Sequence, residues 1–166
     1  MLFVGPFDAG SSVAYPRRAI PAELTEGIRS RIAHVTFASN PCRIRFYTQE
    51  IVLFREDLLK KMQRHLALPL LLPKSSNNEE EAEGAAAAVP DITAQLVESI
   101  MDQSHLFPLP ARAKPIFWDL DYTIRLFPLP HLLVLADHAE KYEYNYQGCN
   151  TVNPGLFLVC CNYYLY

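Results

Sequence analysis

The spacing of apolar and polar residues predicts a β-hairpin in the second quarter of the chain. Ile44 and Phe46 alternate with Arg43 and Arg45, which is the period of a strand with one buried face. Residues 51–54 form a short run that is apolar throughout, which is typical of a strand buried on both faces. The two segments are therefore expected to form neighbouring strands.

A polar turn at residues 48–50 is expected to join these strands, and a helix is predicted directly after them. Glu56 and Asp57 fall in the first turn of that helix, and basic residues follow toward its end. This order of charges suits the helix dipole. The buried face of the helix is expected to consist of Leu58, Leu59, Met62 and Leu66.

The rest of the chain alternates amphipathic segments with short apolar runs. Leu24, Ile28 and Ile32 are four residues apart, which predicts a helix over residues 22–33 with this stripe buried. A second helix is predicted over residues 91–103. Further strands are expected at 2–4, 35–38, 116–118, 122–126 and 132–136, and those at 2–4, 51–54 and 132–136 are expected to be central.

The end of the chain is less regular. Residues 142–146 predict a loop or an edge strand, and residues 148–157 predict a sharp turn at Pro154-Gly155. Strands mixed with helices, without a strict strand–helix repeat, indicate an α/β fold of the layered-sandwich type.

Composition adds limits to this picture. A chain of 166 residues is long enough for one domain with a substantial core, and residues 74–88 predict a mobile acidic and alanine-rich insertion within it. A net charge of −3 gives no overall electrostatic footprint for nucleic acid. The cysteines, which are expected to be reduced and buried, are Cys42, Cys149, Cys160 and Cys161. No apolar run reaches the roughly 18–20 residues of a membrane span, and the first residues do not form a signal peptide.

Several motifs resemble one family. The segments 40–44, 49–52 and 54–58 are similar to the B subunits of DNA polymerase epsilon, most of all the plant form. The resemblance continues, in the family's order, through residues 5–10, 103–110, 118–137 and 153–155. It implies part of a calcineurin-like phosphoesterase fold, truncated at its N-terminus. Residues 1–157 would be the C-terminal half of that domain, and residues 158–166 form a tail unlike the family's.

The resemblance also implies a degenerate metal site. Active relatives of this fold hold two metal ions with carboxylate, imidazole and amide ligands, which suit such ions. In this sequence Gly5-Pro6-Phe7-Asp8 has proline and phenylalanine where ligands are expected, and His105 stands alone. The late motif is reduced to Asp137 and His138. No catalytic residue, metal or cofactor is therefore expected, and a metal-dependent phosphoesterase using Asp8, Asp137 and His138 is the alternative.

A third hypothesis is direct nucleic-acid binding, since arginine and lysine side chains contact phosphates. Arg17, Arg18, Arg43 and Arg45 are the candidate phosphate contacts. The further basic residues that such binding could use are Arg55, Lys60, Lys61 and Arg64. The acidic total charge weighs against this hypothesis for the chain alone.

The resemblance implies a non-catalytic accessory subunit that acts in DNA replication in the nucleus. Its expected partners are the C-terminal zinc-binding region of the catalytic subunit of DNA polymerase epsilon and the replicative helicase assembly. DNA would be reached through the holoenzyme, and no membrane is expected as a partner.

Overall fold

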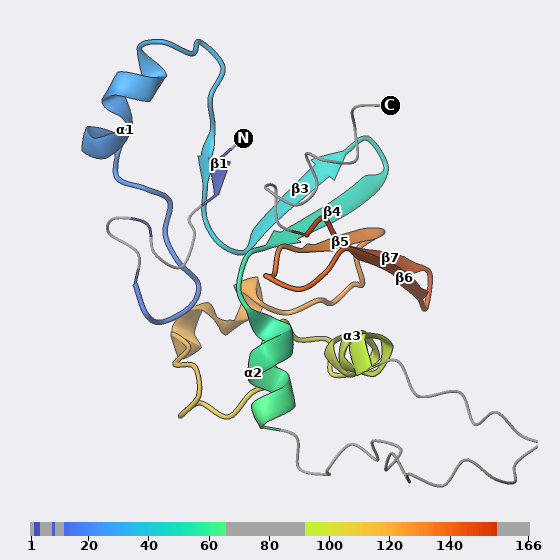
Figure 1. Ribbon diagram of the computed structural model, residues 1–166. Helices are drawn as coiled ribbons and strands as arrows, with labels where there is room; N and C mark the ends of the chain where they lie inside the picture. Colours follow the sequence, from blue (N-terminus) through green and yellow to red (C-terminus); the bar gives the residue numbers. More distant parts are fainter. Residues whose placement is uncertain (1, 4–7, 9–11, 66–91, 156–166) are drawn as a thin grey trace, which may run out of the picture.

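The computed structural model describes residues 2–3, 8, 12–65 and 92–155 (Figure 1). The predicted insertion at 74–88 and the tail at 158–166 lie outside these ranges. Within them, no helix has the length and apolar character needed to cross a membrane.

The described residues form both helices and strands. The helices are α1 (Ala22–Arg29), α2 (Leu58–Arg64), α3 (Ile92–Asp102) and the 3-10 helix η1 (Trp118–Thr123). The strands are β1 (Leu2–Phe3), β2 (Phe37–Ala38), β3 (Cys42–Phe46), β4 (Gln49–Phe54), β5 (Leu132–Leu135), β6 (Tyr142–Tyr146) and β7 (Cys149–Asn153). The predicted α/β class is confirmed.

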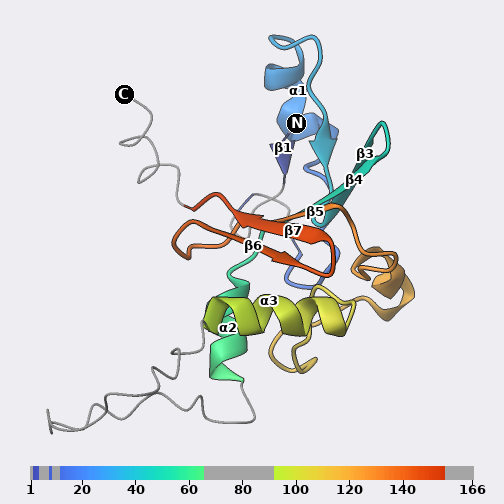
Figure 2. The same ribbon diagram turned by 90° about the vertical axis from the view of Figure 1, so that its right-hand side faces the viewer.

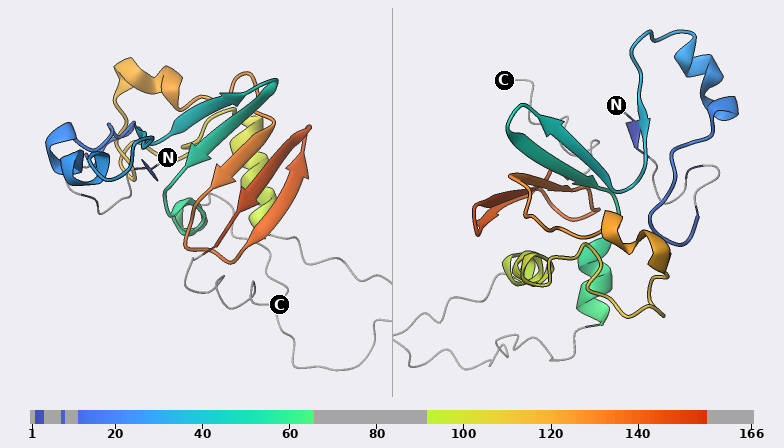
Figure 3. Two further views of the ribbon diagram at one scale, coloured as in Figure 1. Left: turned by 90° about the horizontal axis from the view of Figure 1, so that it is seen from above. Right: turned by 180° about the vertical axis from the view of Figure 1, so that it is seen from behind.

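Five strands form one mixed sheet in the order β3–β4–β5–β7–β6 (Figure 3). The central strand β5 runs parallel to both β4 and β7, and each edge is an antiparallel hairpin, β3–β4 on one side and β6–β7 on the other. The central position predicted for residues 51–54 and 132–136 is therefore confirmed.

The hairpin between β3 and β4 is close to its prediction. Its turn consists of Tyr47 and Thr48, one residue earlier than expected, and Tyr47 has a φ of 52°. A residue other than glycine rarely adopts this left-handed conformation. Phe46, at the end of β3, is 63% exposed, so the predicted buried face does not extend to the turn.

The core lies between the sheet and two helices. Both α2 and α3 lie on the same side of the sheet, as Figures 1 and 2 show from perpendicular directions. The buried side chains of β4 and β5 on that side are Val52, Phe54, Leu133 and Leu135. They join Leu58, Leu59 and Met62 of α2 and Leu96, Val97, Ile100 and Met101 of α3 in one cluster. The apolar stripe predicted for α2 is confirmed, except for Leu66, which lies outside the described residues, and the helix predicted over residues 91–103 is α3.

The opposite face of the sheet is also apolar but only partly buried. By strand register, its aliphatic side chains are Ile44, Ile51, Leu53, Leu132, Val134 and Val152. The prediction that the central strands are buried on both faces is therefore wrong for this face. In the described part of the chain, both helices of the core lie on the other side.

The N-terminal strand was expected in this sheet, and that prediction is wrong. Among the described strands, β1 pairs only with β2, in parallel and in a separate two-stranded sheet. Helix α1 lies between them in the sequence, and in Figure 2 this arm, residues 18–39, projects on the side of the sheet away from α3. Strand β2 of the arm is therefore not part of the central sheet.

Helix α1 ends at Arg29, earlier than predicted, and its predicted buried stripe is exposed. Leu24, Ile28 and Ile32 are 61%, 41% and 52% exposed, and the buried residue of the helix is Thr25. The periodicity identified a helix correctly, but the two-stranded sheet beside it offers too little surface to cover it.

The two strands predicted between residues 116 and 126 are wrong. This segment forms η1, and Trp118 and Tyr122 are 71% and 68% exposed. Aromatic residues favour strands because they pack on a half-buried sheet surface, which these two side chains do not have. Single bridges remain, from Ile116 to Tyr15 and from Arg125 to His105.

A strand was missed at the C-terminal end of the described chain. The edge strand expected at 142–146 is β6, but its partner β7 was predicted as part of a turn region. Polar Asn150, Thr151 and Asn153 obscure the strand pattern, although Cys149, Thr151 and Asn153 alternate on its buried face. Gln147 and Gly148, with φ of 50° and 79°, form the hairpin turn. Cys149 is a buried free thiol, as is Cys42, in agreement with prediction.

Candidate functional site

Of the predicted degenerate phosphoesterase site, the structure describes Asp8, His105, Asp137 and His138. Residues 5–7 lie outside the described ranges, and Asp8 is half-buried. Asp137 and His138 lie just beyond the end of β5, whereas His105 contacts the segment after η1. Over the described ranges, no three histidine, cysteine or acidic side chains are grouped so that they could hold a metal ion.

Asp137 binds the start of a helix. Its Oδ2 accepts a hydrogen bond from the Leu59 amide at 2.8 Å, and Asp57 Oδ1 accepts one from the His138 amide at 3.2 Å. Burial, assisted by the nearby Asp57 carboxylate, raises the pKa of Asp137. These two carboxylates therefore join the first turn of α2 to the end of β5.

His105 is held by a separate set of polar contacts. Its Nε2 lies 3.1 Å from Asp121 Oδ1, and its Nδ1 accepts a hydrogen bond from the Phe107 amide at 3.0 Å. Arg125 Nε donates to the other oxygen of Asp121 at 2.7 Å. Desolvation opposes ionisation of Asp121, but Arg125 and His105 outweigh it and hold its pKa below the usual range. Both ring nitrogens of His105 are engaged in this arrangement.

The four candidate phosphate contacts have different surroundings. Arg18 and Arg45 are exposed, and Arg43 Nη1 lies 2.6 Å from Glu50 Oε1. Arg17 is only 2% exposed and is therefore buried. Of the further basic residues considered for nucleic acid, Arg55, Lys60 and Arg64 are exposed, while Lys61 pairs with Glu56.

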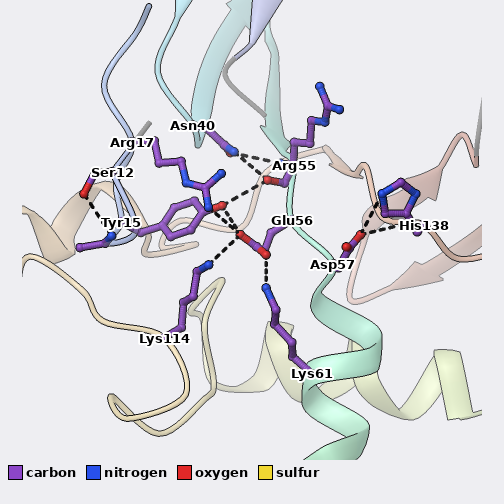
Figure 4. A network of polar contacts seen from close by, with 11 residues as sticks. Ser12, Tyr15, Arg17, Asn40, Arg55, Glu56, Asp57, Lys61, Lys114 and His138 are labelled. Carbon is purple, nitrogen blue, oxygen red and sulfur yellow. Dashed lines mark hydrogen bonds and ion pairs between the residues drawn. The ribbon is translucent and has the colours of Figure 1, made fainter. Parts of the chain in front are cut away.

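Arg17 belongs to a buried group of charges centred on Glu56, which Figure 4 shows from close by. Glu56 Oε2 lies 3.3 Å from Arg17 Nη2 and 3.3 Å from Lys114 Nζ. Its other oxygen pairs with Lys61, and the Tyr15 hydroxyl donates to Oε2. We call these five residues the Glu56 cluster. It joins three segments that are far apart in the sequence.

Two backbone segments of the cluster are fixed by Asn40. The Asn40 and Arg17 backbones exchange hydrogen bonds of 3.0 and 2.8 Å, and the Asn40 side chain bonds the Arg55 carbonyl at 2.7 Å and the Arg55 amide at 3.1 Å. Because Arg55 directly precedes Glu56, Asn40 holds the backbone beside both residues of the buried ion pair. Asn40 itself is buried.

The electrostatics of the cluster are set by its burial. Burial would raise the pKa of Glu56, but Lys61, Tyr15 and Lys114 together hold it below its usual range. Burial lowers the pKa of Lys114, and burial together with the Glu56 carboxylate raises the pKa of Tyr15. The Arg17 guanidinium carbon lies 4.5 Å from the centre of the Tyr15 ring, and Lys114 Nζ lies 5.3 Å from it.

Sequence reasoning missed this cluster. Glu56 was interpreted as an acid in the first turn of a helix, but α2 begins at Leu58, and Glu56 is a buried residue between strand and helix. Its position two residues after an apolar run was the available signal, since polar residues at the carboxyl ends of parallel strands gather at one edge of a sheet. Nothing marked Tyr15, which is 41 residues away.

The sequence was compared with known families and proteins. The model of the family described as the B subunit of DNA polymerase alpha/epsilon matches residues 1–144. The chain belongs to this family. It is 43% identical over 157 residues to the DNA polymerase epsilon B subunit of Arabidopsis thaliana, with 94% of the chain covered. It is 35% identical to the B subunit of Schizosaccharomyces pombe over 95% of the chain, and 38% identical to subunit 2 of Mus musculus over 92%.

The match covers nearly all of this chain but only about a quarter of each relative. It covers 27% of the Arabidopsis and Schizosaccharomyces proteins and 26% of the mouse protein. The chain therefore spans about a quarter of the length of these relatives. The resemblance stated from its motifs is confirmed, including its continuity along nearly the whole sequence.

Proposed function

We propose that this chain is the C-terminal part of a non-catalytic accessory subunit of the DNA polymerase epsilon complex, acting in DNA replication in the nucleus. The observation that carries the proposal is the match to subunits with that name along nearly all of the chain. The role is structural, because the positions expected to hold ligands in active phosphoesterases are occupied by residues such as Pro6 and Phe7.

Residues 1–157 act as one half of a layered domain in this proposal. The partly exposed aliphatic face of the five-stranded sheet supports it, because a sheet normally buries both apolar faces between layers. The polypeptide that covers this face belongs to the part of the subunit that lies outside the matched quarter of the relatives.

The assembled domain docks on the C-terminal zinc-binding region of the catalytic subunit and connects it to the replicative helicase assembly. DNA is reached through the holoenzyme rather than through a basic surface of this chain. Two of the basic residues considered for phosphate contact, Arg17 and Lys61, support this, since both pair with the buried Glu56.

Co-purification tests the docking proposal. The catalytic subunit's C-terminal region carries the tag, and the full-length subunit that contains this chain is co-expressed with it. We expect a stable complex, and we expect its loss when the cysteines that bind zinc in the tagged region are replaced by serine. If both partners fold and no complex forms, the proposal is wrong.

An assay of phosphodiester hydrolysis tests the competing phosphoesterase hypothesis. The same full-length subunit is assayed with and without manganese, beside the variants Asp8→Asn and His138→Ala. We expect no manganese-stimulated hydrolysis. Activity that manganese stimulates and that either substitution abolishes would replace the proposed structural role with an enzymatic one.

A further inference from the structure

Two apolar surfaces of this chain are exposed in the structure. The first, which we call the arm stripe, consists of Leu24, Ile28 and Ile32, which are 61%, 41% and 52% exposed. The second, which we call the outer face, is the side of the five-stranded sheet away from α2 and α3. Its aliphatic side chains, all partly exposed, are Ile44, Ile51, Leu53, Leu132, Val134 and Val152. Apolar surfaces of this kind mark places where a protein meets another polypeptide.

The outer face is the kind of surface that a helix normally covers. Its central strands β4, β5 and β7 run parallel, and parallel strands are almost always covered by helices on both faces. Of the charged residues in the five strands, the register places only Glu143, in the edge strand β6, on this face. The centre of the face is therefore uncharged and suits the apolar side of an amphipathic helix.

The arm holds its helix away from the sheet of its own chain. At the base of the arm the backbones of Asn40 and Arg17 exchange hydrogen bonds of 3.0 and 2.8 Å, and β2 pairs with β1 beside this base. From there the arm projects on the outer side of the sheet, as Figures 2 and 3 show. A helix that projects in this way can reach the sheet of a second copy.

We propose that two copies of this chain associate through these surfaces, with the arm stripe of each copy packed on the outer face of the other. Because each copy provides one stripe and one face, a two-fold arrangement closes after two copies. The association gives each sheet a helix on its second face. This proposal goes beyond the accessory role: a second copy and any polypeptide of a complete subunit that covers the outer face exclude each other.

The size of the two surfaces predicts a weak and reversible dimer. Five strands about 4.8 Å apart, each roughly five residues long, make a face of about 24 by 17 Å, or about 400 Å² in projection. The arm stripe is about 12 Å long and adds on the order of 100 Å². A standard interface buries about 800 Å² per partner, so we expect a dissociation constant of about 10–100 μM. At lower concentrations the chain is monomeric and the arm stripe stays exposed.

Sedimentation equilibrium of the 166-residue chain, at loading concentrations on both sides of that range, measures the association. We expect a monomer that becomes a dimer as concentration rises. Ile28→Asp, in the middle of the arm stripe, and Val134→Lys, in the central strand β5, should each weaken the dimer at least tenfold. The controls Ala22→Asp and Thr48→Lys add the same charges at exposed positions on α1 and in the β3–β4 turn, and should change it less than twofold.

Mixing the two weakened variants tests whether stripe and face meet each other. In a mixed dimer one contact is natural, and the other places the introduced aspartate opposite the introduced lysine. The mixture should therefore associate at least fivefold more tightly than either variant alone. If Val134→Lys does not fold by circular dichroism, Val152→Lys on the neighbouring strand takes its place. A mixture no tighter than its components, a monomer at every concentration, or growth beyond a dimer overturns the proposal.

Discussion

Helices α1 and α3 have the same kind of sequence pattern and opposite surroundings. Leu96, Val97 and Ile100 of α3 are at most 2% exposed, whereas the corresponding stripe of α1 is 41–61% exposed. The difference lies in what each helix packs against. Helix α3 covers a five-stranded sheet, while α1 connects two strands of two residues each. An amphipathic period therefore predicts that a helix forms, but not that a surface is present to bury its stripe.

The contacts that hold the sheet to its helices also differ from those that hold the chain entering the arm. The sheet and its helices are held by a continuous apolar cluster. The chain entering the arm contributes Tyr15 to that cluster and is held in addition by charges and hydrogen bonds. Arg17 and Tyr15 precede α1, and both bind Glu56 beneath the sheet's edge. The Glu56 cluster is thus the main polar connection between the two regions.

The largest loss of folding stability is expected from removing the acid of the Glu56 cluster. Glu56→Ala leaves three buried or half-buried cations without their acid, which costs about 3–5 kcal/mol for a buried ion pair that loses one partner. Urea unfolding followed by circular dichroism measures the change. Glu23→Ala, which removes an exposed acid from α1, is the control and should stay within about 0.5 kcal/mol. Equal effects at the two positions would show that Glu56 does not join the regions.

Truncating one isoleucine in each helix sharpens the comparison. Ile100→Ala should destabilise the chain by about 2–5 kcal/mol, because it removes a side chain with no exposed surface from the core. Ile28→Ala removes the same atoms from a side chain that is 41% exposed and should cost much less, about 0.5 kcal/mol. A large cost at Ile28, measured by the same unfolding experiment, would mean that something in solution covers the stripe of α1.

A smaller effect on folding stability, which depends on pH, is expected from changing Asp137. Burial raises its pKa in the folded state, so the folded protein holds this proton more tightly than the unfolded chain does. The associated stability is present below the ordinary aspartate pKa of about 3.9 and is lost as pH rises through the raised value. Asp137→Asn keeps an acceptor for the Leu59 amide and removes this loss. Relative to the natural chain, the variant should therefore gain stability between about pH 4 and pH 7.

Urea midpoints at the two pH values check this expectation. Asp119→Asn, at an exposed position on η1, serves as the control for the loss of one acidic side chain. A stability difference between the natural chain and Asp137→Asn that does not depend on pH would contradict the assignment of the raised pKa to this carboxyl group.

The sequence was informative where the hydrophobic period was unbroken. Strands β4 and β5 and helix α3 were predicted, because a continuous apolar run and an amphipathic segment each favour one kind of element. Strand β7 was missed since its buried positions include Thr151 and Asn153, whose polarity resembles a loop. For η1 the error was reversed: Trp118 and Tyr122 resemble strand residues, but both are exposed.

The candidate site was harder to predict than the fold. Glu56 contacts Tyr15 and Arg17, which lie 41 and 39 residues away in the sequence, and local pattern carries no information on such pairs. Asp137 and His138 were singled out through the family resemblance, which marked their place in a degenerate motif. Their contacts with Leu59 and Asp57 depend on how the end of β5 meets α2, which only the folded chain shows.

The order of strands in the sheet has a consequence for how the chain folds. The two edge hairpins, β3–β4 and β6–β7, are each closed by a two-residue turn, and local hairpins form in about 1–10 μs. The central pairing is different, because Ile51 of β4 meets Leu132 of β5 across roughly 80 residues of sequence. Closing a loop of that length costs chain entropy before any contact repays it, and such non-local pairing slows folding. The joining of β5 to β4 therefore carries the main entropic barrier to folding. Strand β5, which lies at the centre of the finished sheet, is thus the strand that pairs with β4 most slowly.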